Sequence, residues 1–266
     1  MMQRLYLTFL LSIHFCSSCS GPPVVKKSDL ELAETGKHCA QITLVSSIGG
    51  YAIRHYLGYV LSYNSCWYIP NWVAYELTAE EVVSGSPPFR GVFVADTTVS
   101  FVQSDGYDFR GSGWSRGHMA PAADFKWSRK AYGDTFYYTN CCPQDQSMNN
   151  GSWNVLENHV RRLAKKYGAV YVVTGPVVGT NRFGKIGAHQ VVVPDGFFKA
   201  LLVNRNNSFY AIGFYMENVP EKQPIKECYL TIDELEELTG FDFFPFLEDN
   251  VENSIEAEVN TSVWFK

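Results

Sequence analysis

The chain is organised around two segments, Ser115-Arg116-Gly117-His118-Met119-Ala120-Pro121-Ala122-Ala123-Asp124-Phe125 and, further along, Asn149-Asn150-Gly151-Ser152-Trp153-Asn154-Val155-Leu156-Glu157. The first segment places an imidazole beside a glycine and a guanidinium, on an apolar run that turns at Pro121. This setting predicts that His118 is exposed and does not belong to the core. The second segment places the amide of Asn149 directly before a predicted helix.

That helix is expected from about Gly151 to Tyr167. At about 100° per residue, Glu157 and Arg161 fall at the edge of its apolar face. A charged pair at this edge is held rigidly by the core and still faces a cleft. The apolar stripe consists of Leu156, Val160, Leu163 and Tyr167.

A histidine, an asparagine amide, a glutamate and several arginines together indicate phosphodiester hydrolysis assisted by one hard metal ion. His118 is predicted to be the base, because the ordinary pKa of histidine lies near the working pH. Asn149 offers a neutral oxygen to Mg²⁺, which prefers oxygen ligands and usually keeps several waters. Glu157 is expected to orient those waters. The forked donors that grip the phosphate are expected from Arg90, Arg116 and Arg161.

These residues belong to a series of blocks that resembles the DNA/RNA non-specific endonuclease family with a ββα-metal active site. A short histidine motif alone is weakly specific, whereas several blocks in family order, from about residue 57 to 250, are strongly specific. Besides the two segments above, the blocks are Pro70-Asn71-Trp72-Val73-Ala74-Tyr75-Glu76-Leu77-Thr78, Arg90 with Phe93 and Asp96, Thr139-Asn140 before Pro143-Gln144, Val173-Thr174-Gly175-Pro176, Phe197-Phe198-Lys199, and Glu237-Leu238-Thr239-Gly240-Phe241-Asp242-Phe243-Phe244-Pro245.

The resemblance implies a Mg²⁺-dependent enzyme that cuts DNA and RNA and leaves 5′-phosphate ends, with Mn²⁺ as a substitute ion. It implies that His118 is the general base and that Asn149 is the single protein ligand of the ion. Supporting roles are implied for Arg90, Arg116, Asn140, Glu157 and Arg161. Two alternatives stay open: a phosphodiesterase for another substrate, and a nucleic-acid-binding module that kept the fold without catalysis.

One position departs from the family pattern. The commonest family motif opens with aspartate where this chain has Ser115. We expect altered support of the loop and not a loss of activity.

The N-terminal residues predict an export signal. Arg4 supplies a charge, Leu5 to Phe15 form an apolar core too short to span a bilayer, and Ser17-Ser18 are the small residues before Cys19. The sequence around Cys19 resembles a bacterial lipoprotein cleavage site, with ordinary cleavage and release as the alternative. We therefore expect an exported bacterial protein that is periplasmic, anchored to the outer membrane or extracellular, and that meets a membrane only through a lipid on Cys19.

The expected organisation is a signal peptide at residues 1–19, a tether at 20–50 and one endonuclease domain at 51–266. The fold class is α+β, with a mostly antiparallel central sheet, flanking helices and a ββα-metal motif. A capping box at Thr231 and Glu234 predicts a second helix that ends at Gly240. The expected strands are Leu57–Asn64, Trp72–Leu77, Ala169–Thr174, His189–Val193, Phe197–Asn204 and Phe209–Met216. The first two are expected to form a hairpin whose tip holds Cys66 and Pro70.

Charge and cysteine content give further limits. The net charge is −5, which is weak support for a nucleic-acid binder, but residues 106–168 hold nine Lys/Arg against five Asp/Glu, whereas 216–266 hold three against thirteen. The predicted site therefore lies in the positive part of a polarised molecule.

The cysteine spacing lacks the paired motifs of a structural zinc site. Disulfide pairing stays open for Cys39, Cys66, Cys141, Cys142 and Cys228.

Overall fold

The computed structural model describes residues 45–46, 52–85 and 89–265. The predicted signal peptide, Cys19 and most of the predicted tether lie outside these ranges, so the division at residues 19 and 50 stays a prediction. Val45–Ser46, the described part of the tether, form strand β1, which pairs with β13 (Asp242–Phe243).

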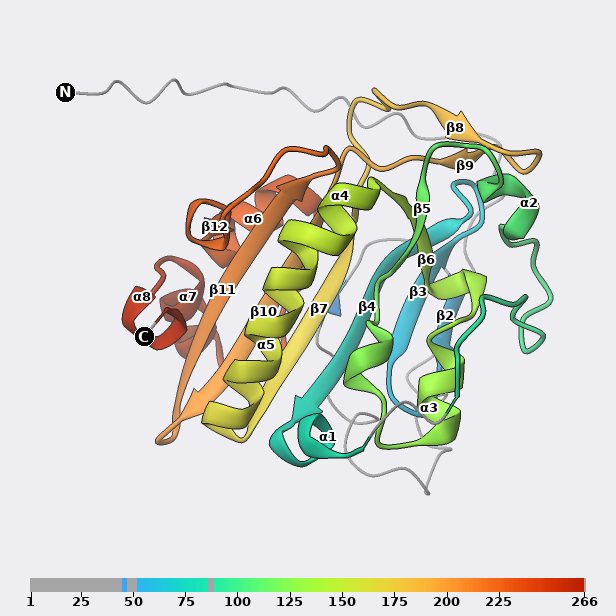
Figure 1. Cartoon of the computed structure of the whole chain (residues 1–266). Coiled ribbons are helices and arrows are strands. Elements are labelled where there is room, and N and C mark those ends of the chain that lie inside the picture. The colour runs from blue at the N-terminus through green and yellow to red at the C-terminus, as the bar shows by residue number, and fades with distance from the viewer. Residues whose placement is uncertain (1–44, 47–51, 86–88, 266) are drawn as a thin grey trace.

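A seven-stranded sheet forms the centre of the molecule (Figure 1), in the order β12-β11-β10-β7-β4-β3-β2. Every neighbouring pair in it is antiparallel. The predicted α+β fold with a mostly antiparallel sheet is confirmed. The strands are β2 (Ala52–His55), β3 (Val60–Asn64), β4 (Ile69–Thr78), β7 (Ala169–Val177), β10 (Gly196–Arg205), β11 (Ser208–Glu217) and β12 (Tyr229–Leu230).

Both faces of the sheet are covered, so its central strands are apolar on both sides. On β4, Val73 and Tyr75 belong to the core beneath helix α5 (Asn154–Tyr167). The alternate residues Trp72 and Ala74 belong to a second core beneath α6 (Ile232–Thr239). This period of two follows from the pleat of a strand, and Figure 1 shows α5 in front of the sheet with α6 behind it.

The helices match the local signals in the sequence. Thr231 Oγ1 accepts from the Glu234 backbone N–H at 3.1 Å, and the Glu234 carboxylate accepts from the Thr231 N–H at 2.9 Å. Gly240 follows in the left-handed conformation, with φ of 70°, which confirms the predicted cap. No helix in the described ranges has the length and apolarity that crossing a bilayer requires. The remaining helices are α1 (Ala79–Val83), α2 (Gly106–Phe109), α3 (Arg129–Asp134), α4 (Gln146–Met148), α7 (Asp249–Glu256) and α8 (Thr261–Trp264).

Three expectations about element boundaries are wrong. Pro70 lies inside β4 and not in the hairpin turn, which lies closer to Tyr68, where φ is 60°. Of the predicted strand at 189–193, only Val191–Val192 form a strand, β9. It pairs with β8 (Lys185–Ile186) in a separate two-stranded sheet. Helix α5 begins at Asn154, after a π-helical turn over Asn149–Trp153.

Candidate active site

Two short strands and the helix that follows them carry the predicted site. β5 (Ser115–His118) pairs antiparallel with β6 (Cys141–Gln144), and the chain then passes through α4 and the π-helical turn into α5. Gly117 permits the close contact of the two strands, because a Cβ there would lie 1.8 Å from the Gln144 side chain. Cys141 and Cys142 are buried in β6, form no disulfide within the described part of the chain, and have thiol pKa values raised by burial.

Asn149 is tied to β5 through Ser115. The Ser115 hydroxyl donates to the Gln144 carbonyl at 2.8 Å, and the Asn149 Nδ2 donates to the same hydroxyl at 3.3 Å. This contact occupies the nitrogen end of the amide and leaves the oxygen end for another partner. The serine therefore supplies a hydrogen-bond acceptor at the position where the family's commonest motif has a carboxylate.

Asn149 also opens the π-helical turn. Such turns are rare and frequently occur at functional sites. A neutral amide oxygen that points away from its anchored nitrogen fits the preference of Mg²⁺ for oxygen ligands.

His118 is half-buried, so the prediction of an exposed ring is wrong. Its ring packs against Phe93, with centroids 4.5 Å apart, and edge-on against Phe136 at 4.9 Å. Burial between these rings lowers the pKa of His118 to about 4. The imidazole is therefore neutral near pH 7. Its Nε2 is buried and has no hydrogen-bond partner among the described residues.

Asn140 is completely buried and bonds only to the backbone. Its Nδ2 donates to the carbonyls of Ala120 at 3.0 Å and Thr135 at 2.8 Å. Its Oδ1 accepts from the Ala120 N–H at 2.8 Å. The side chain thus holds the turn that follows His118 and has no donor left for a substrate.

Arg161 pairs with Asp124 and not, as the helix spacing suggested, with Glu157. The Arg161 Nη1 lies 2.6 Å from Asp124 Oδ1, and the second Asp124 oxygen accepts from the Tyr75 hydroxyl at 2.9 Å. Asp124 is buried, whereas the Arg161 side chain keeps 14% exposure. The guanidinium is therefore held by Asp124, and its Nη2 donates to Asn158 Oδ1 at 3.1 Å.

Glu157 lies near a lysine that the sequence reasoning missed. Burial raises the pKa of the Glu157 carboxyl, and the charge of Lys199 partly offsets this rise. Lys199 is fully buried, donates to Thr174 Oγ1 at 3.1 Å and lies 4.6 Å from the centroid of the Trp153 ring. A lysine inside an otherwise apolar strand was the signal in the sequence, since lysine is almost never fully buried unless paired.

The remaining predicted residues are arginines on the surface. Arg116 is exposed and places its guanidinium 5.8 Å from the centre of the Phe93 ring. Arg90 is also exposed, and the described residues give it no contact with the other candidates. The structure thus brings Arg116 to His118 through Phe93 and leaves Arg90 apart.

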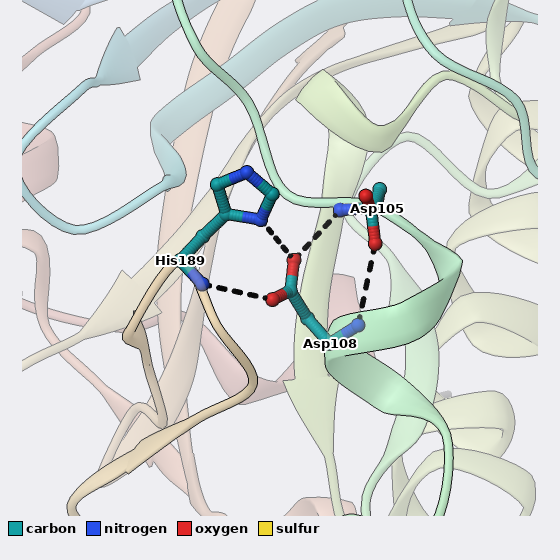
Figure 2. A group of neighbouring side chains, drawn as sticks. All are labelled: Asp105, Asp108 and His189. Atoms are coloured by element: carbon teal, nitrogen blue, oxygen red, sulfur yellow. Dashed lines mark hydrogen bonds and ion pairs between the residues drawn. The ribbon is translucent and has the colours of Figure 1, made fainter.

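Among the described residues, two groups of acidic and histidine side chains lie close enough together to hold a metal ion. One is Asp105, Asp108 and His189; the other is Asp233, Glu236 and Glu256. In the first group the side chains bond to one another and to the backbone (Figure 2): the Asp108 carboxylate accepts from the His189 ring at 2.9 Å and from the His189 N–H at 3.0 Å. Its role is therefore a link between α2 and the loop that carries His189.

The sequence of this chain is similar to those of known nucleases. The family model described as DNA/RNA non-specific endonuclease matches residues 40–250. The mitochondrial nuclease EXOG of Xenopus laevis is 34% identical over 75% of this chain and 60% of its own length. The chain thus spans less than two thirds of that relative. Human mitochondrial endonuclease G is 35% identical over 70% of this chain and 67% of its own length.

The solved structures agree with this similarity. A crystal structure of the complex of EndoG with EndoGI matches with a TM-score of 0.72 and 32% identity, over 76% of this chain and 89% of that chain. The names of the relatives contradict the predicted location in or outside a bacterial envelope, because EXOG and endonuclease G are mitochondrial nucleases. That prediction is wrong. The chain belongs to the DNA/RNA non-specific endonuclease family.

Proposed function

We propose that this chain is a metal-dependent nuclease that hydrolyses phosphodiester bonds of DNA and RNA without sequence specificity. The observation that carries the proposal is the Ser115 bridge, which ties Asn149 to the strand that ends in His118. A neutral imidazole and an anchored amide on one ββα unit are the parts that such a hydrolysis needs.

In this proposal His118 accepts the proton of the attacking water. Its low pKa keeps the ring in the neutral form that a general base requires at neutral pH. Asn149 would hold Mg²⁺, or Mn²⁺ in its place, through the amide oxygen. When bound, the ion polarises a phosphoryl oxygen and stabilises the leaving oxygen.

The charged residues around this pair have distinct proposed tasks. Arg161, fixed by Asp124, and the exposed Arg116 bind the phosphate. Glu157 orients water at the site, and its charge is balanced by Lys199. Asn140 holds the turn after His118. The proposed task of Arg90 is to contact the substrate backbone outside this centre.

The substrate class agrees with the charge distribution. The chain is acidic overall, at −5, yet residues 106–168 carry a local excess of lysine and arginine. Phosphate contacts provide most sequence-independent affinity for nucleic acid and weaken with added salt. We therefore expect binding to DNA and RNA that falls steeply between low and physiological salt.

The test is digestion of plasmid DNA and total RNA by the full chain with Mg²⁺, with Mn²⁺ and with EDTA. We expect both substrates to be cut with either ion and neither with EDTA. His118→Ala is expected to lower the rate by about 100-fold or more, the usual contribution of general-base catalysis. His55→Ala, which changes an exposed histidine on β2, is the matched control and is expected to keep full activity.

Binding measured in parallel separates the alternatives. Wild-type protein that binds nucleic acid but cuts it with no divalent ion would be a binding module and not an enzyme. Cleavage of a small phosphodiester without cleavage of DNA or RNA would indicate another substrate.

A further inference from the structure

A cavity of about 740 Å³ adjoins the proposed site, and of its lining residues the function proposed above uses only Ser115 and Arg116. We call it the aromatic groove. Its lining includes four aromatic rings and two guanidinium groups, from Phe93, Tyr107, Phe109, Trp114, Arg110 and Arg116. Tyr107 keeps 74% of its surface exposed.

The aromatic groove begins at the proposed reacting centre. Phe93 lines it, and the same ring lies 4.5 Å from the His118 ring. Ser115 also lines it and accepts the hydrogen bond of Asn149. A nucleic-acid strand whose phosphate lies between His118 and Asn149 would therefore place a neighbouring nucleotide in the groove.

The chemistry of the walls suits a nucleotide with an unstacked base. The Arg110 guanidinium lies 4.9 Å from the centre of the Tyr107 ring, and that of Arg116 lies 5.8 Å from the centre of the Phe93 ring. Aromatic faces stack on bases of any sequence, and arginine binds the phosphate between them. A base inside a duplex is already stacked and paired on both sides, so only an unpaired base can present its face to the groove.

The wall that carries Tyr107 and Arg110 is held firmly in place. Helix α2 has only four residues, and Asp108 anchors it to His189 (Figure 2). The loop of His189 comes so close that a Cβ on Gly187, where φ is +67°, would lie 2.2 Å from the Asp108 carboxylate. Because the wall is preformed, binding a base in the groove requires little ordering of the protein.

We propose that the aromatic groove binds an unpaired nucleobase next to the scissile phosphate, which makes single-stranded nucleic acid the preferred substrate. This inference rests on the proposed nuclease function for the position of the phosphate. Three of the residues that line the groove, Tyr107, Arg110 and Trp114, take no part in the proposed chemistry.

Equilibrium binding tests the groove separately from catalysis. The full chain is titrated in EDTA against a fluorescently labelled single-stranded oligonucleotide and against a duplex of the same sequence. Tyr107→Ala is expected to weaken single-strand binding about tenfold and to leave duplex binding unchanged. Tyr107→Phe keeps the ring and is expected to bind like the wild type. Tyr229→Ala removes another exposed tyrosine, on β12, and is the matched control.

With Mg²⁺, the same Tyr107→Ala variant is expected to raise KM for the single strand about tenfold while kcat changes little. Equal losses on single strand and duplex, no loss on either, or no binding by the wild type would each overturn the proposal. If the wild type binds but never cuts, the nuclease function fails, whereas the groove is still judged by the binding data. An unchanged thermal unfolding midpoint of Tyr107→Ala shows that the variant is folded.

Discussion

At the scale of single residues, Ser115 decides how Asn149 is presented. Its hydroxyl holds the amide nitrogen at 3.3 Å and is itself fixed by the Gln144 carbonyl. A residue that orients a metal ligand typically contributes 10- to 100-fold to metal affinity or activity. In this chain a neutral hydroxyl therefore holds the Asn149 amide at the position where the family's commonest motif has aspartate.

Ser115→Ala removes this support, and we expect the Mg²⁺ concentration for half-maximal cleavage to rise about tenfold. The rate at saturating Mg²⁺ should recover most of the wild-type value, because the variant keeps His118 and Asn149. Titration of DNA cleavage with Mg²⁺ measures both quantities. Ser208→Ala, at an exposed serine on β11, is the control. A lower maximal rate with unchanged Mg²⁺ dependence would show that Ser115 acts in some other way.

His118 gives a prediction about pH. Burial lowers its pKa from the ordinary 6.5 to about 4, so the neutral base is present at neutral pH and is lost only as pH falls through that lower value. We expect the acid limb of kcat/KM to have its midpoint well below 6.5. Phe136→Ala opens one side of the ring to water, since Phe136 packs edge-on against it, and should shift the midpoint upward. pH–rate profiles of both proteins, within the pH range where each stays folded, measure this shift; identical midpoints would contradict it.

At the scale of elements, one ion pair joins helix α5 to the segment after β5. Arg161 and Asp124 lie 37 positions apart in sequence, and their contact fixes the helix against the turn that follows His118. Breaking a buried ion pair on one side leaves an uncompensated charge and typically costs about 3–5 kcal/mol. The partial exposure of the Arg161 side chain places this pair toward the lower end of that range.

Asp124→Asn keeps an acceptor for Tyr75 and removes only the charge. We expect it to lower the free energy of unfolding by about 3 kcal/mol, as measured by chemical denaturation at neutral pH. The double variant Asp124→Asn/Arg161→Gln removes both charges and should recover part of this loss. Equal stability of the single and double variants would mean that the ion pair is not what joins the two elements.

The same elements show why the sequence predicted some features and not others. The capping box at Thr231, the helix over α5 and the strand at Trp72–Leu77 are predicted from local signals, and the structure contains all three. The partner of Arg161 was misjudged because helical spacing identifies only near neighbours such as Glu157. An apolar run such as Val191–Val193 predicts burial but not a location, and it is buried in a ribbon outside the main sheet.

The burial of His118 was missed for a related reason. Its surroundings come from Phe93 and Phe136, which precede and follow it at distances that no short motif spans. Lys199 likewise meets Glu157 only because β10 passes beneath α5. Residue types at the site could thus be read from the sequence, whereas their burial and their partners depend on tertiary contacts.

At the scale of the whole molecule, the two faces of the sheet carry different electrostatics. The proposed site lies with α5, whereas α6 and α7 on the opposite core carry the group Asp233, Glu236 and Glu256. Glu256 is only 8% exposed. Burial, followed by repulsion from Glu236 and other nearby carboxylates, raises its pKa to about 8.

This raised pKa makes the stability of the fold dependent on pH. Because the folded protein binds the proton of Glu256 more tightly than the unfolded chain, stability is full below the ordinary carboxyl pKa and is lost as pH rises through about 8. Glu256→Gln has no charge to develop, so we expect it to unfold at a higher temperature than the wild type at pH 9 and at a similar one near pH 4. Each pKa unit corresponds to about 1.4 kcal/mol, so a gain of at least that order is expected at pH 9.

Thermal unfolding of both proteins across this pH range measures the effect, with Glu258→Gln, at an exposed carboxylate beyond α7, as the control. Nuclease activity at neutral pH should be unchanged in both variants, because neither residue lies on the α5 face. If the unfolding temperatures of wild type and Glu256→Gln changed with pH in the same way, ionisation of Glu256 would not destabilise the folded protein. Converging profiles at low pH and diverging profiles at high pH would instead locate a pH-sensitive contribution to stability on the sheet face opposite the proposed site.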